Sequence, residues 1–165
     1  ELLSKLEFLD KENAEMHIIG HLQSNKVKYV VGKASLIHSV DSLQIASAIN
    51  EQAGKLKVMQ DILLEVNISG EESKYGLTTE EIPNIIKEIG SLKNVSFKGF
   101  MTMAPLGAPE DEIRSIFRCA HSLFTQYKDC GADILSIGMS GDFEIAVEEG
   151  ATHIRVGSSI FKKGM

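Results

Sequence analysis

Two consecutive segments near the end of the chain place small and hydroxyl-bearing residues directly after apolar runs. Residues 134–138 lead into Ser140 and Gly141, and residues 152–156 lead into Gly157 and Ser158. Backbone amides and hydroxyl groups at two neighbouring turns that open helices can donate hydrogen bonds to one anion. The pattern therefore predicts a phosphate site at these turns. The alternative is that Ser140 and Ser158 only cap helices and that Gly157 only makes a tight turn.

Arg155 lies inside the last apolar run, where an unpaired guanidinium would be costly to bury. Successive residues of a strand point to opposite sides, so Arg155 faces away from Val156 and toward a lumen or pocket beside the phosphate turn. We expect this permanent cation to contact a ring or an acid group of the ligand. The alternative is a structural ion pair with Asp or Glu on a neighbouring strand.

A long polar segment, residues 65–76, follows another apolar run and contains Asn67 and Lys74. Loops of this length at the ligand-binding end of a sheet are often functional. If the loop is functional, we expect Lys74 to approach a phosphate or a carbonyl group of the ligand. The alternative is that Lys74 is only a solvated loop side chain.

The chain has five histidines, and three of them are considered for the site. His17 and His38 are expected to be hydrogen-bonded core residues, whereas His21 follows Gly20 at the end of a run and is the histidine we expect in the pocket. None has the spacing of a zinc motif, so we predict no metal.

Repeated strand and helix units are needed to position these residues. Short β-branched runs alternate with amphipathic stretches about every 27 residues, the pattern of a parallel sheet covered by helices in a closed barrel or a doubly wound fold. In both folds the ligand lies at the carboxyl ends of the strands. The expected strands are Met16–Gly20, Ser35–Ser39, Asp61–Asn67, Ser96–Met101, Asp133–Gly138 and Thr152–Val156.

Local signals mark the ends of the expected helices. Asp41 and Gly54 are the expected caps of a helix that begins at Ser42. A second helix is expected to begin near Thr78 or Thr79 and a third after Pro109.

Composition limits the classes of function. The chain has 165 residues, 43% of them apolar, and a formal charge of −6, which favours one domain and argues against nucleic acid as a partner. No apolar run reaches the roughly 18 to 20 residues that span a bilayer, so we expect no membrane association and a cytoplasmic protein. Cys119 and Cys130 are expected to be reduced thiols. No Gly-x-Ser-x-Gly, Walker or Gly-x-Gly-x-x-Gly motif is present.

Five motifs distributed along the chain carry a family resemblance. They are Ile18–Lys26, Val66–Ser69 with Ser73–Gly76, Gly99–Met103, Leu135–Phe143 and Ile154–Phe161. From about Met16 to Phe161 the chain resembles the pyridoxal-phosphate homeostasis proteins, the single-domain group related to the N-terminal barrel of alanine racemase.

The resemblance implies a (β/α)8 barrel that holds pyridoxal 5′-phosphate (PLP) without established catalysis and influences cellular vitamin B6 and amino-acid pools. It implies that Arg155 faces the pyridine nitrogen, which suits a group that does not release its proton. No catalytic residue is expected. The candidate cofactor contacts are Ser140, Met139 through its neighbouring amides, Arg155, Gly157, Ser158, His21, Asn67 and Lys74.

The start of the chain departs from the family pattern. Family members carry a Schiff-base lysine at the end of the first strand and a Gly-Glu-Asn motif near the end of the second, and neither is found here. The six strands are therefore expected to be the third to the eighth, in a single PLP-binding alanine-racemase-like domain over 1–165 that lacks the first two strands. We assign no Schiff-base lysine. The open edges predict a monomer, or a homo-oligomer that pairs through them.

The sequence thus predicts a PLP-binding carrier or regulator in intracellular vitamin B6 homeostasis, with a small-molecule cofactor and no enzymatic turnover. One alternative is a fragment of a PLP-dependent amino-acid racemase similar to alanine racemase. Another is a phosphate-binding barrel isomerase or aldolase, which needs paired acid and base groups at strand ends. Those ends offer Asn67, Ser140 and Arg155 instead.

Overall fold

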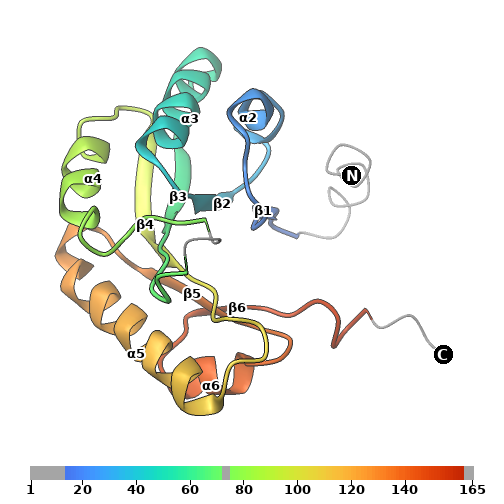
Figure 1. The fold of residues 1–165 in the computed structure, drawn as a ribbon. Coiled ribbons are helices and arrows are strands. Elements are labelled where there is room, and N and C mark those ends of the chain that lie inside the picture. The colour runs from blue at the N-terminus through green and yellow to red at the C-terminus, as the bar shows by residue number, and fades with distance from the viewer. Residues whose placement is uncertain (1–13, 72–74, 162–165) are drawn as a thin grey trace.

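Six parallel strands form one curled sheet whose spatial order follows the chain, β1-β2-β3-β4-β5-β6 (Figure 1). This computed structural model describes residues 14–71 and 75–161. The helices lie outside the sheet, and β1 and β6 flank its open side, as in a partial (β/α)8 barrel. The strands are β1 (His17–Ile18), β2 (Leu36–Val40), β3 (Gln60–Glu65), β4 (Val95–Met101), β5 (Ile134–Met139) and β6 (His153–Arg155). The predicted fold class and the six predicted strands are confirmed.

The helices of the described residues follow the strands in alternation. Pro109 precedes α5 and acids occupy its first turn, as the sequence indicates. α4 begins at Ile82, and Thr78 instead donates its backbone N–H and hydroxyl to the Glu81 carboxylate just before it. The elements are η1 (Ser24–Lys26), α2 (Val27–Val30), α3 (Leu43–Leu56), α4 (Ile82–Ile89), α5 (Glu110–Gln126), η2 (Lys128–Cys130) and α6 (Phe143–Glu148).

Both predicted caps of α3 are wrong. Ser42 caps its start, because the Ser42 hydroxyl accepts a hydrogen bond from the Ile45 amide at 3.3 Å. The helix continues past Gly54 to Leu56, and Lys57 ends it in the left-handed conformation with φ 56°. Gly54 has a packing role instead, since a Cβ at this position would lie 2.9 Å from the side-chain nitrogen of Asn94.

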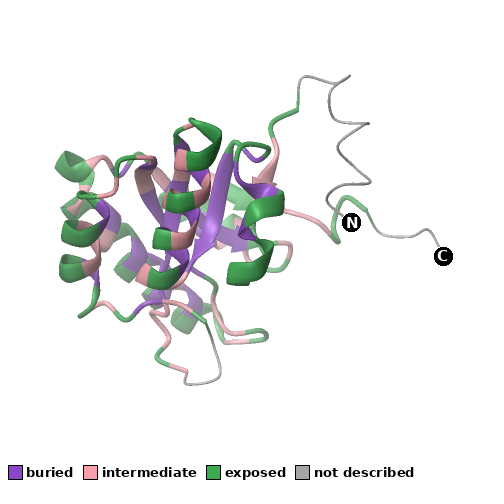
Figure 2. Ribbon diagram, turned by 90° about the horizontal axis from the view of Figure 1, so that it is seen from above, coloured by how far each residue is buried: buried purple, intermediate pink, exposed green. Residues whose placement is uncertain are grey.

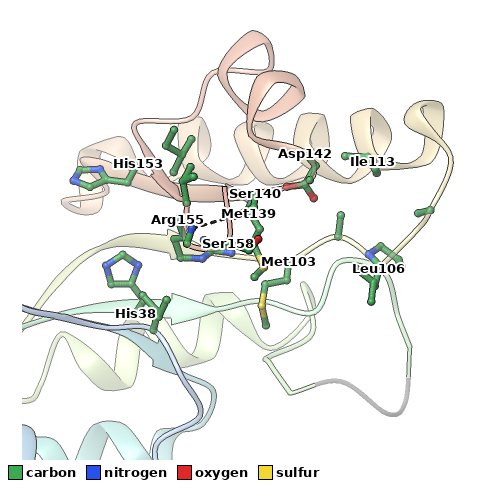
Figure 3. A pocket seen from close by; sticks show the side chains of 18 of the residues that line it. His38, Met103, Leu106, Ile113, Met139, Ser140, Asp142, His153, Arg155 and Ser158 are labelled. Carbon is green, nitrogen blue, oxygen red and sulfur yellow. Dashed lines mark hydrogen bonds between the residues drawn. The ribbon is translucent and has the colours of Figure 1, made fainter. Parts of the chain in front are cut away.

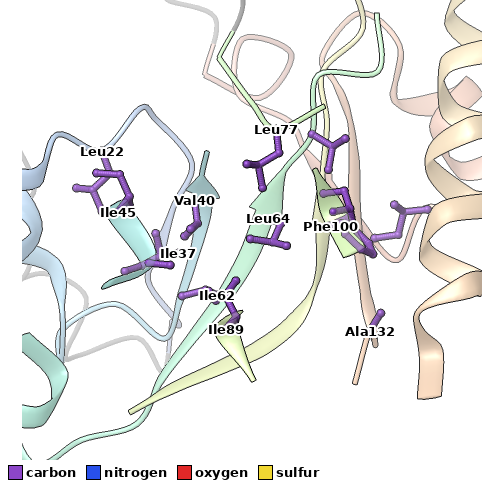
Figure 4. Packing of buried hydrophobic residues seen from close by; sticks show 14 of the residues in the cluster. Leu22, Ile37, Val40, Ile45, Ile62, Leu64, Leu77, Ile89, Phe100 and Ala132 are labelled. Carbon is purple, nitrogen blue, oxygen red and sulfur yellow. The ribbon is translucent and has the colours of Figure 1, made fainter. Parts of the chain in front are cut away.

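The two faces of the sheet have different surroundings, because residues alternate along each strand. Figure 2 shows the sheet buried and the outer faces of the helices exposed. The side toward the helices carries the main apolar core, which includes Ile37, Ile62, Leu64 and Phe100 (Figure 4). A smaller apolar group centred on Leu63 and Met101 is separate from this core.

Buried polar residues accompany the apolar ones on the strands. His38, Glu65 and Ser136 are all at most 4% exposed. They lie on β2, β3 and β5, and the hydrogen bonds described below show that His38 and Ser136 face the same interior as Arg155 of β6. The curl of the sheet therefore brings polar side chains from separate strands together in the lumen.

Gly138 allows α6 to pack closely against β5. Its φ is 87°, and a Cβ there would lie 2.5 Å from the Cβ of Ala146. Only glycine combines this conformation with this close approach. The chain can therefore turn sharply after β5, which fixes the position of Met139 and Ser140.

Candidate functional site

The turns that follow β5 and β6 are in direct contact. The Ser140 hydroxyl oxygen accepts hydrogen bonds from the backbone amides of Gly157 at 3.1 Å and Ser159 at 3.4 Å. The Ser159 hydroxyl in turn donates to the Ser140 carbonyl at 3.4 Å. Asp142 is the N-cap of α6, so the interpretation of Ser140 as a plain helix cap is wrong. Two backbone amides therefore converge on one oxygen atom, a geometry that is also found around bound anions.

Met139 contributes its side chain to this region. Its backbone amide donates to the Asp142 carboxylate at 2.5 Å, so that amide is engaged within the protein. The Met139 side chain is partly exposed and lines the cavity next to Ser140. After β6, the described residues form a turn in which the amides of Ile160 and Phe161 both donate to the Gly157 carbonyl. The rest of the helix expected there lies outside the described residues.

Arg155 points into the lumen and is held by neutral oxygen atoms. Its Nη1 donates to the carbonyl and hydroxyl oxygens of Ser136, both at 2.8 Å, and its Nη2 donates to the Thr102 carbonyl at 3.0 Å. Within residues 14–71 and 75–161 no carboxylate lies within ion-pair distance of it, so the structure gives no support to the ion-pair alternative. Burial lowers the pKa of Arg155, while the nearby charges of Asp142 and Glu65 raise it.

A guanidinium has five N–H donors. Three hydrogen bonds of Arg155 are made within the described protein, which leaves two N–H groups for a ligand. Arg155 lines the cavity that contains Ser140, Gly157 and Ser158, so the predicted anion turn and the predicted cation belong to one site (Figure 3).

The cavity has a volume of about 1210 Å³, large enough for a ligand of cofactor size. Its walls are mainly apolar, and polar residues from several elements also line it. Met103 and the loop from Ala104 to Ala108 form the side that lies across from β6 in Figure 3. The polar lining residues are His17, His38, Tyr75, Ser140, Asp142, His153, Arg155 and Ser158.

The histidines that line the cavity do not include His21, the histidine expected there from the sequence. His21 does not line it, because its Nδ1 pairs with the Asp41 carboxylate at 3.0 Å and its ring stacks on Tyr75 with 3.9 Å between centroids. Tyr75 does line the cavity, so His21 supports its rim from behind. The expectation that His21 is the pocket histidine is therefore wrong.

Three other histidines, His17, His38 and His153, take that place. His38 is also the predicted hydrogen-bonded core residue: it is 2% exposed, and its Nδ1 lies 2.9 Å from the Ser136 hydroxyl. Burial, followed by the charges of His17, Arg155 and His153, lowers the pKa of His38 to about 3. The signal that could have found His153 is its position two residues before Arg155, which places both on the same face of β6.

Asn67 organises its own loop. Its side-chain oxygen accepts hydrogen bonds from the Ser69 hydroxyl and the Gly70 amide, both at 3.1 Å, and its amide nitrogen donates to the Glu71 carbonyl at 2.8 Å. It is not among the residues that line the cavity. Lys74 lies outside the described residues.

Glu65 is a buried carboxyl group at the end of β3 that the sequence interpretation did not single out. It is 4% exposed. Burial and then the charge of Asp41 raise the pKa of Glu65 to about 7, against an opposing effect of Arg155. The lumen thus contains a carboxyl group whose pKa is raised by its burial.

Other expectations can be compared with the described part of the chain. No group of three or more His, Cys, Asp or Glu residues there is arranged to hold a metal ion. Cys119 and Cys130 are both exposed and unpaired. None of the described helices combines the length and the apolar character needed to cross a bilayer.

Comparison with known sequences identifies relatives over nearly the whole chain. Residues 6–163 match the family described as alanine racemase, N-terminal domain. A pyridoxal phosphate homeostasis protein of Aquifex aeolicus is 41% identical over 164 residues, which cover 98% of this chain and 72% of that protein. A protein of the same name from Helicobacter pylori is 39% identical, with 99% of this chain and 73% of that protein covered.

A solved structure shares the architecture. PipY of Synechococcus elongatus PCC7942, determined without PLP, has a TM-score of 0.90 and 32% identity, covering 97% of this chain and 76% of PipY. The structure of PipY with PLP bound has a TM-score of 0.87 and 31% identity. The chain therefore belongs to the alanine racemase N-terminal domain family and, within it, to the pyridoxal phosphate homeostasis proteins.

Proposed function

We propose that this protein binds PLP reversibly and acts as a carrier or regulator in intracellular vitamin B6 homeostasis. The observation that carries the proposal is that the contacting turns at Ser140 and Gly157 open into the same cavity as the Arg155 guanidinium. Relatives named for pyridoxal phosphate homeostasis and the PLP-bound structure of PipY support it.

The phosphate end fits the contacting turns. The Ser140 oxygen already occupies the place where the amides of Gly157 and Ser159 converge, so it marks a position for a phosphate oxygen. A phosphate that enters would take over these amides, and the Ser140 hydroxyl would turn to donate to it. Nothing lies within 4 Å of the position of a Cβ on Gly157, so the turn has room on that side.

The ring end fits the unused donors of Arg155. A pyridine nitrogen that carries no proton accepts a hydrogen bond, and a guanidinium supplies one without giving up its own proton. The side chains of Met103, Met139 and Ile154 provide apolar surface in the same cavity for the faces of the ring. The residues at hand therefore fit the cofactor at both ends.

The same arrangement favours binding over catalysis. When bound, PLP supplies an electrophilic aldehyde and a ring that can accept electron density, most strongly when the ring nitrogen is protonated. Arg155 would donate to that nitrogen without giving up its own proton, which would weaken the ring as an acceptor of electron density. We therefore propose a non-catalytic role, against the alternative of a racemase similar to alanine racemase.

The remaining parts of the proposal concern organisation. We propose that residues 1–165 form one PLP-binding domain that works in the cytoplasm. We also propose that it is a monomer, or a homo-oligomer that pairs through the edges of β1 and β6, which have no strand on their outer side in the described sheet.

Binding of a ligand series tests the function. Absorbance titration and equilibrium dialysis should show binding of PLP and of pyridoxamine 5′-phosphate, at least tenfold weaker binding of pyridoxal, and competition by inorganic phosphate. Equal binding of PLP and pyridoxal would remove the phosphate site from the proposal. Interconversion of D- and L-alanine above background would instead support the racemase, and a band that borohydride reduces would overturn our assignment of no Schiff-base lysine.

A further inference from the structure

Four polar side chains from four strands form a continuous chain of hydrogen bonds below the cavity. Arg155 donates from Nη1 to the Ser136 hydroxyl at 2.8 Å. The Ser136 hydroxyl lies 2.9 Å from Nδ1 of His38, and Nε2 of His38 lies 3.1 Å from Nδ1 of His17. Ser136 is fully buried and His38 nearly so, whereas His17 on the edge strand β1 is partly exposed.

Arg155 fixes the direction of this chain. A guanidinium can only donate, so the Ser136 oxygen accepts from Arg155 and its hydroxyl proton is free to donate onward. In the described part of the chain, Nδ1 of His38 lies within hydrogen-bond distance of that hydroxyl and accepts its proton. His38 then carries its single proton on Nε2 and donates it to Nδ1 of His17. The direction of donation runs from the cavity toward the edge strand.

This series of hydrogen bonds holds the Arg155 guanidinium in place and does not transfer protons to the cavity. Arg155 does not release a proton at physiological pH, so a proton relay would stop there. A second proton on His38 would add a positive charge near Arg155 in a buried site and would leave the Ser136 hydroxyl proton without its acceptor. The network is therefore satisfied only with neutral His38.

The partners of Arg155 leave its positive charge available to a ligand. Its three partners in the described chain are neutral oxygen atoms of Ser136 and Thr102. Asp142 and Glu65 influence it only as nearby charges, and the rings of His17 and His153 have their centroids 6.2 Å apart. The positive charge of Arg155 is thus oriented without being neutralised by a bonded carboxylate.

We propose that Ser136 and His38 are positioning residues for Arg155, which hold its guanidinium toward the cavity and leave its charge for a ligand atom that accepts hydrogen bonds. This inference deepens the proposed function and rests on it for the identity of the ligand. The orientation itself is a property of the protein alone, so it can be tested without PLP.

Two serines provide a matched comparison. Ser136→Ala removes the link between Arg155 and His38, and Ser136→Thr keeps a hydroxyl at that position. The control is Ser39→Ala, because Ser39 is also a fully buried strand serine, but its hydroxyl donates to the Gly20 carbonyl at 2.7 Å and it does not line the cavity. We expect Ser136→Ala to weaken PLP binding about tenfold, Ser136→Thr to restore most of it and Ser39→Ala to leave it unchanged.

Nuclear magnetic resonance of the protein without ligand tests the positioning directly. In the wild type we expect ¹⁵N shifts of the Nε2–H tautomer for His38 between pH 5 and 8, and separate Nη signals for Arg155 because its rotation is restricted. Ser136→Ala should merge the Nη signals, and Ser39→Ala should not.

The outcomes separate the two proposals. An Nδ1–H tautomer, or a His38 that titrates near pH 6, in the wild type would overturn the positioning role even if Ser136→Ala does not fold. Equal effects of Ser136→Ala and Ser39→Ala on PLP binding would do the same. Absence of PLP binding with the expected NMR signals would contradict the proposed function and leave the positioning role supported.

Discussion

The backbone amide of Gly157 donates a hydrogen bond to the hydroxyl oxygen of Ser140 at 3.1 Å, which joins the turn after β5 to the turn after β6. The two residues are 17 positions apart and lie on neighbouring strand ends. On the proposed function, a phosphate oxygen would replace the Ser140 hydroxyl oxygen as the acceptor of this amide, and the Ser140 side chain would turn toward the ligand. The two turns are therefore already held together by this contact in the protein alone.

Two substitutions of Gly157 should distinguish the effect of an added negative charge on PLP binding from the effect of an added side chain. Gly157→Asp places a negative charge at the anion turn and should weaken binding of PLP at least tenfold. Gly157→Ala is the control, since a Cβ there meets nothing within 4 Å, and it should bind within about threefold of the wild type. Fluorescence titration measures both. A Gly157→Asp protein with wild-type affinity would show that the phosphate binds elsewhere.

Substitution of Gly138 should destabilise the fold through the turn that carries Ser140. Gly138→Ala forces a Cβ to within 2.5 Å of Ala146 at a φ of 87°, so we expect a loss of about 2 to 4 kcal/mol in the free energy of unfolding. Gly141→Ala, where nothing lies within 4 Å, should change it by less than about 0.5 kcal/mol. Urea unfolding followed by circular dichroism gives both values. Similar losses for the two variants would contradict the close approach of α6 to β5.

The carboxyl group of Glu65 should make stability fall as the pH rises from 4.5 toward 7. Its pKa is raised to about 7 in the folded protein from an ordinary value of 4.5, so the folded state binds the proton more tightly. This contribution is complete below pH 4.5 and is lost as the pH rises through 7, for a total of about 3 kcal/mol. Glu65→Gln should therefore match the wild type at pH 4.5 and be more stable at pH 8. A constant difference across this range in urea unfolding would refute the buried, shifted carboxyl.

The imidazole of His38 should make stability fall in acid. Its pKa is lowered from 6.5 to about 3 in the folded protein. Between these two pH values the unfolded state binds a proton and the folded state does not, so stability decreases as the pH falls from 6.5 toward 3. His38→Gln should be less stable than the wild type at pH 7.5, because Ser136 loses a partner, yet should lose less further stability between pH 6.5 and 4.5. Some dependence remains, since burial also lowers the pKa of His153. Parallel pH profiles for both proteins would argue against a neutral, buried His38.

The caps of α3 show where local sequence signals stop being sufficient. Asp41 and Ser42 both carry side chains that can cap a helix, and the sequence alone favours neither strongly. In the fold, the Asp41 carboxylate pairs with His21 and also accepts the Ser42 hydroxyl proton at 3.1 Å. The Ser42 oxygen is then oriented to accept from the Ile45 amide. A contact with a residue 20 positions away therefore decides which side chain caps the helix.

The sequence by itself determined the six strands, their parallel order and the placement of Ser140, Arg155 and Gly157 at strand ends, because hydrophobic alternation and turn residues act over a few positions. Only the tertiary structure decided which side chains meet across the lumen. His38 and Ser136 are 98 residues apart, and their contact depends on the register and curl of the whole sheet. For the same reason His17, His38 and His153 line the cavity, whereas His21 turns to Asp41 and Tyr75.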